Sequence, residues 1–137
     1  MNPNPVIVLK LAALAHLGLI SAGVLMPRVT GLWGELAKIK PFACGLFRVY
    51  YAFIGLCLVS FGLGSWFLAP QLADGSTLAR AVCGFLAVFW TIRLGAAIRV
   101  FDVRPFLTIP WCQRGYHALN AVFGTFPFVY GWLALRR

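Results

Sequence analysis

Arg93 is the residue of this sequence whose position most needs a chemical explanation. It lies inside the apolar run FLAVFWTIRLGAAIR, residues 85–99, where the next charge is Arg99. A guanidinium keeps its charge and presents five N–H donors, so its burial is costly unless an anion or several acceptors lie beside it. Arg93 therefore predicts an anion-binding position or a contact with a partner subunit.

Two further polar residues interrupt the last apolar run. His117 and Asn120 share one helical face with Gly124, at i, i+3, i+7 spacing. At a rise of 1.5 Å per residue, Arg93 and Asn120 come about 5–7 Å from the bilayer centre on one side, and His117 about 12 Å. Such a cluster could clamp an anionic amphiphile with Arg93 and exchange a proton through His117. The simpler interpretation is that Asn120 links two helices and His117 lies among headgroups.

Three more residues complete the predicted ligand- or partner-binding set. Trp90 offers an aromatic ring near Arg93, while Arg99 and Tyr116 lie on the side toward which the cluster opens. The spans contain no Asp or Glu. We therefore expect the counter-charge of Arg93 to come from outside this chain, as a lipid phosphate, a ligand carboxylate or a partner's acidic residue.

The two histidines raise the alternative of a b-type haem. One iron needs both imidazoles at the same depth, whereas helical rise separates His16 and His117 by about 16 Å along the bilayer normal. Haem with two histidines of one chain is therefore disfavoured, and single-histidine ligation through His16 or His117, or ligation shared between chains, stays open. No other cofactor is expected, and no metal site. The four cysteines (Cys44, Cys57, Cys83 and Cys112) form no C-x-x-C pair, so we interpret them as small apolar residues.

Composition sets the environment in which these residues must act. Of the 137 residues, 61% are hydrophobic and 11% charged, against about 45–50% apolar and 25% charged in soluble domains. Charged residues bound four apolar spans, at about 6–27, 42–69, 77–101 and 114–135, each near the roughly 20 residues that a membrane helix needs. The runs do not alternate in polarity as barrel strands do. We predict one all-α membrane domain, an antiparallel up-down bundle of four transmembrane helices.

The connections add three local predictions. Residues 28–41, RVTGLWGELAKIKP, have the spacing of a short interfacial helix between the first two spans. Asp74 or Ser76 is expected to cap the third long helix. Small residues recur four apart in three spans, which predicts close helix contacts there. They are Gly18 and Ala22; Ser60 and Gly64; and Ala87, Thr91 and Gly95.

Lysine and arginine predict the orientation. Seven of them fall on the side of the first and third loops: Arg28, Lys38, Lys40, Arg48, Arg99, Arg104 and Arg114. Four fall on the other side: Lys10, Arg80, Arg136 and Arg137. The positive-inside rule then places loops 28–41 and 102–113 in the cytoplasm and both termini outside, in a bacterial inner membrane.

Several function classes are disfavoured. A proton- or cation-coupled transporter usually needs a carboxylate within the membrane, and nucleic-acid binding needs a basic stripe where this chain has scattered charges. Our first hypothesis is a non-enzymatic accessory or scaffold subunit of a larger membrane complex, or a binder of an anionic lipid or amphiphile. Its partners would be membrane lipids and partner subunits or further copies of the chain. The alternatives are a small membrane enzyme acting on an anionic lipophilic substrate, with Arg93 as clamp and His117 as acid or base, and a haem- or pigment-associated subunit.

Overall fold

The computed structural model of the chain describes residues 3–99 and 110–136, apart from the side chain of Cys112. Within these ranges the chain is helical and has no strand. The long helices are α1 (Pro5–Val29), α3 (Pro41–Phe67), α5 (Thr77–Arg99) and α6 (Pro110–Leu135), and the short ones are α2 (Leu32–Leu36) and α4 (Ala69–Leu72). Four helices are long and apolar enough to cross a membrane. The all-α class and four helices able to span a membrane are thus confirmed, whereas most of the predicted loop 102–113 lies outside the described residues.

The helix ends follow from local chemistry. At the start of α5, the hydroxyl of Ser76 accepts a hydrogen bond from the backbone N–H of Ala79 at 3.2 Å. The carboxylate of Asp74 accepts one from the N–H of Ser76 at 2.7 Å and shapes the preceding turn. Ser76 is therefore the N-cap, as one of the two predicted candidates. Gly31, with φ of 67°, allows the sharp turn between α1 and α2.

The short helix predicted within residues 28–41 is present as α2, with five residues. An ion pair between Lys38 and Glu35, at 2.7 Å, lies beside its end. Both side chains are largely exposed, so this pair contributes little to stability.

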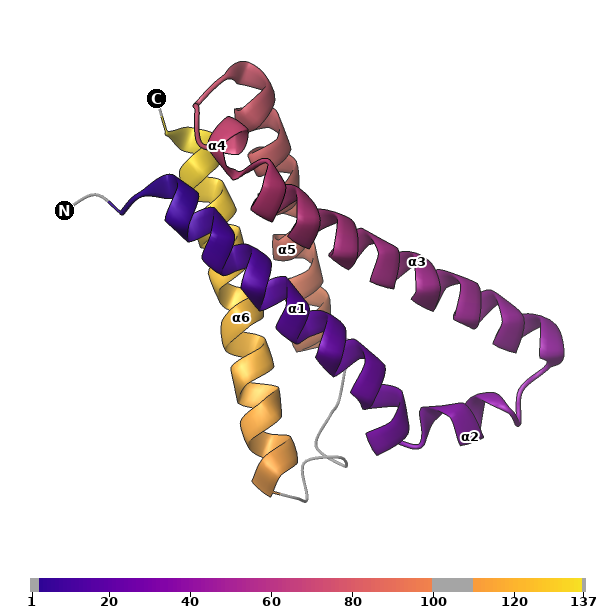
Figure 1. Ribbon diagram of the computed structural model, residues 1–137. Helices are drawn as coiled ribbons and strands as arrows, with labels where there is room; N and C mark the ends of the chain where they lie inside the picture. The colour runs from indigo at the N-terminus through magenta and orange to yellow at the C-terminus, as the bar shows by residue number, and fades with distance from the viewer. Residues whose placement is uncertain (1–2, 100–109, 137) are drawn as a thin grey trace.

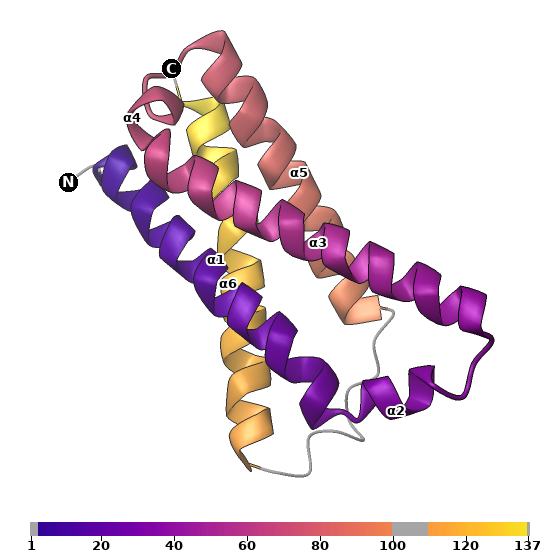
Figure 2. The same cartoon turned by 45° about the vertical axis from the view of Figure 1, so that its right-hand side comes forward.

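The long helices are arranged as two pairs. α1 packs along α3, α5 packs along α6, and the pairs meet through α1 and α6 (Figures 1 and 2). α4 joins α3 to α5 at one end of the molecule, and α3 then diverges from α5 toward the end that carries α2 (Figure 1). The core lies between α1, α5 and α6, and Ser65 is the buried residue that α3 contributes.

The glycines of the predicted small-residue rows do not lie at close contacts between these helices. A Cβ added at Gly18, Gly64 or Gly95 would meet nothing within 4 Å among the described residues. Close approach occurs instead at Gly62, where an added Cβ would lie 3.1 Å from the Cβ of His16. The buried core between the helices contains aromatic side chains of α5 and α6, namely Trp90, Phe123, Phe126 and Tyr130, together with aliphatic ones.

Candidate functional site

Arg93 lies at the contact between α5 and α6. Its side chain is half-buried, and its guanidinium carbon lies 5.1 Å from the ring centre of Phe123 on α6. This geometry is a cation–π contact, in which the ring face attracts the charge. Arg93 therefore lies against the neighbouring helix of its own pair.

The other residues of the predicted cluster occupy different environments on α6. Asn120 is half-buried and lies about one turn before Phe123, the residue whose ring Arg93 covers. His117 is exposed, and its ring lies against that of half-buried Tyr116, with the centres 5.7 Å apart. It precedes Phe123 by six residues, about 9 Å along the helix axis. The structure thus places Arg93 near the Asn120 turn and leaves His117 at the surface.

The remaining two predicted residues, Arg99 and Trp90, lie in different environments. Arg99 is exposed at the last turn of α5. Trp90 points into the core, where its side chain is 1% exposed and its ring contacts those of Phe123 and Phe126. Trp90 is therefore a packing residue between helices, and the binding roles assigned to this set remain predictions.

His16 is the central polar residue that sequence reasoning considered only as a haem ligand. It is fully buried, and aromatic rings from three helices surround it at centre distances of 4.4–6.5 Å. They belong to Phe61 of α3, Trp90 of α5, and Phe126 and Tyr130 of α6. All four long helices therefore meet at His16. The sequence signal for this central position was a lone histidine in the middle of an apolar span.

The hydrogen bonds of His16 fix its tautomer. Nδ1 lies 2.7 Å from the carbonyl oxygen of Ala12, which can only accept, so Nδ1 carries the proton. Nε2 is then an acceptor, and it is buried without a partner among the described residues. The indole N–H of Trp90 is buried without a partner as well. The core thus holds one unused acceptor and one unused donor.

A second polar contact in the core links α3 to α6. The hydroxyls of Ser65 and Tyr130 lie 2.7 Å apart, and both side chains are at most 1% exposed. A bond of this kind satisfies two polar groups that lipid could not satisfy. It joins the divergent helix α3 to the rest of the core.

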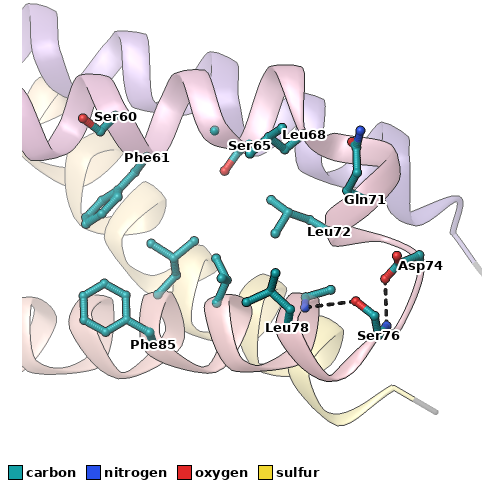
Figure 3. A pocket seen from close by; sticks show the side chains of 14 residues that line it. Ser60, Phe61, Ser65, Leu68, Gln71, Leu72, Asp74, Ser76, Leu78 and Phe85 are labelled. Atoms are coloured by element: carbon teal, nitrogen blue, oxygen red, sulfur yellow. Dashed lines mark hydrogen bonds between the residues drawn. The ribbon is translucent and has the colours of Figure 1, made fainter.

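A groove opens between α3 and α5, beside α4, with a volume of about 510 Å³ (Figure 3). Its α3 wall includes Phe61, Gly64 and Ser65, and its α5 wall includes Val82 and Phe85. Asp74 and Ser76 lie together at the α4–α5 turn, whereas Ser60 and Ser65 line the groove farther along α3 (Figure 3). The charged residue among those that line the groove, Asp74, is therefore at one end.

The described residues contain no group of three or more His, Cys, Asp or Glu side chains that could hold a metal ion. Aromatic rings surround His16, and His117 is exposed. Single-histidine haem ligation through His16 or His117 stays a prediction.

Comparison of the chain with protein-family models, with curated proteins and with solved structures finds no match.

Proposed function

We propose that this chain is a non-enzymatic integral membrane protein that serves as an accessory or scaffold subunit of a larger membrane complex, with α3 facing a partner subunit. The observation that carries the proposal is the exposure of α3. Its most apolar stretch of 18 residues contains no buried residue, whereas the corresponding stretch of every other spanning helix does. Each helix of a self-contained bundle buries one face. The apolar stretch of α3 is instead left uncovered by the described residues of this chain.

The outer face of α3 has the pattern of a helix-packing surface. Leu56, Val59, Leu63 and Phe67 follow one another at three- and four-residue spacing and are 38–70% exposed. Such a row forms one continuous ridge. Helices in lipid associate through close packing of such surfaces, and this ridge supports a partner helix there.

The proposed topology is an antiparallel up-down bundle in a bacterial inner membrane, with loops 28–41 and 102–113 in the cytoplasm. The bias of Lys and Arg toward these loops supports this orientation.

Photo-crosslinking tests the partner. A photoreactive amino acid at Leu63 should give one adduct of constant mass, and the same adduct should form from Val59. The control is Leu14 on α1, which is 50% exposed and lies outside the ridge, and should not give it. The crosslinked protein should co-purify with the chain at fixed stoichiometry in mild detergent. Equal adducts from Leu14 and Leu63, or none from either ridge position, would contradict the proposal.

A second candidate function, binding of anionic lipid, rests on a separate observation. Six described basic residues lie at or near the end that carries α2: Arg28, Lys38, Lys40, Arg48, Arg99 and Arg114. The acidic residue described at that end, Glu35, is already paired with Lys38. This excess of positive charge matches anionic headgroups. Native mass spectrometry should show retention of phosphatidylglycerol over phosphatidylcholine, and a joint Lys38→Gln and Lys40→Gln change should reduce it.

The geometry favours binding over catalysis. An enzyme using Arg93 as clamp and His117 as acid or base would need both at one substrate. His117 is exposed, about 9 Å along α6 from the ring that Arg93 covers. Arg93 and the Asn120 turn remain the better placed pair for an anionic ligand or a partner's acidic residue.

A further inference from the structure

The groove between α3 and α5 has the properties of a lipid site (Figure 3). We propose that it binds the hydrocarbon chain of a membrane lipid whose head group carries an ammonium, with the head beside Asp74. This site lies on a different face of α3 from the outer ridge of Leu56, Val59, Leu63 and Phe67, so it is independent of the proposed partner subunit.

The size and lining of the groove suit a hydrocarbon chain. Its volume of about 510 Å³ falls in the range of small-molecule pockets, about 300–1,000 Å³. Beyond the turn its walls are mostly apolar, with Phe61 and Leu68 on α3 and Val82 and Phe85 on α5. The wall at Gly64 is open, because a Cβ added there would meet nothing within 4 Å. A flexible chain can fill this space without displacing a side chain.

The closed end of the groove argues against a spanning partner helix as the occupant. Leu72 of α4 and the following turn, with Asp74 and Ser76, line the end where α3 and α5 are joined (Figure 3). A transmembrane helix is about 10 Å wide and must cross the whole bilayer. In this groove it would collide with α4. A lipid can enter from the side, with its head at this end and its chain lying along the groove between α3 and α5.

The polar end of the groove indicates the head group. Asp74 is the charged residue among those that line the groove, and one of its carboxylate oxygens accepts a hydrogen bond from the N–H of Ser76. Its side chain is exposed, so the carboxylate can still accept hydrogen bonds from outside. A carboxylate attracts an ammonium and repels a head group of net negative charge. Phosphatidylethanolamine carries this ammonium, and phosphatidylglycerol does not.

Photolabelling of the delipidated protein in detergent tests the site. The probe is phosphatidylethanolamine with a diazirine in its acyl chain, and labelled positions are read by tandem mass spectrometry. We expect saturable labelling of the α3 and α5 segments that line the groove, displaced by unlabelled phosphatidylethanolamine. Labelling that does not saturate, or that spreads evenly over all four long helices, would overturn the proposal.

Two matched glycine variants localise the binding. Gly64→Leu fills the groove, and we expect saturable labelling to fall at least about tenfold, equivalent to 1.4 kcal/mol. Gly18→Leu is the control, because Gly18 is also a helical glycine with nothing within 4 Å of an added Cβ, but lies on α1 outside the groove. Both changes raise helix propensity, so circular dichroism should show retained helix. Equal labelling of Gly64→Leu and the wild type would overturn the site.

A third variant tests the head group. In the wild type, phosphatidylethanolamine should displace the probe better than phosphatidylglycerol. Asp74→Asn should remove this preference and keep saturable labelling of the groove. Equal displacement by the two lipids in the wild type would overturn the assignment of the ammonium to Asp74.

Discussion

The hydrogen bond between Ser65 and Tyr130 allows a quantitative test of how α3 is held to the core. Tyr130→Phe removes one hydroxyl and leaves that of Ser65. A serine in a helix can turn its hydroxyl to a carbonyl four residues back, as Ser21 does with Leu17 at 2.9 Å. Ser65→Ala leaves the phenol of Tyr130, which is 0% exposed and too far from its own backbone for the same rescue. The two single changes should therefore differ in cost.

The magnitudes follow from the burial of each group. Tyr130→Phe should lower the free energy of unfolding by about 0.6 kcal/mol, the mean for hydrogen bonds between membrane helices. Ser65→Ala should lower it by about 1–3 kcal/mol, the cost of a buried unsatisfied polar group. The double variant should be less destabilised than the sum of the two, because both single changes break the same bond.

Unfolding in mixed micelles of mild detergent and dodecyl sulfate, followed by circular dichroism, measures these differences. Ser21→Ala is the matched control, since it also removes a hydroxyl from an apolar helix but at an exposed position, and it should change stability by less than about 0.5 kcal/mol. Additive effects in the double variant, or a larger cost for Tyr130→Phe than for Ser65→Ala, would refute the reasoning.

Four further predictions concern charge, helix capping and topology. Arg93→Leu should keep the helical content, because Leu can pack against Phe123, and it should abolish binding of any anionic ligand or acidic partner at that position. Native mass spectrometry measures this loss. An unchanged set of bound species would assign Arg93 a packing role. Ser76→Ala should lower the unfolding free energy by about 1 kcal/mol through loss of the N-cap. The backbone and hydroxyl of Ser76 hold the pKa of Asp74 below its usual range. The contribution of this turn to stability is therefore present at neutral pH and is lost as the pH falls below the usual pKa range of aspartate. A wild-type protein that gained stability relative to Asp74→Asn as the pH was lowered through that range would contradict this sign. A membrane-impermeant thiol reagent added to intact cells should not label Cys112, and efficient labelling there would invert the proposed topology.

The sequence predicted the elements well because their signals are local. Lys and Arg positions bounded the four spans. Ser76 is a residue type preferred at the N-cap. The helical spacing of Leu32, Trp33 and Leu36 indicated α2. Each of these features depends on residues within one or two turns of each other.

The packing could not be predicted in the same way. The small-residue row of Ser60 and Gly64 predicted a helix contact, but it lines an open groove because α3 diverges from α5. Whether such a row meets a helix depends on a crossing angle that larger residues elsewhere impose. His16 likewise became central only when rings from three other helices were brought around it. These are properties of the assembled chain.

The divergence of α3 also gives the molecule a tapered outline, narrow at the α4 end and broad at the α2 end (Figures 1 and 2). A tapered body in a bilayer would displace more lipid from one leaflet than from the other. This difference in area would be relieved where the bilayer curves so that the leaflet at the narrow α4 end lies on the concave side. Copies of this protein would then be favoured in membrane regions that curve in this sense.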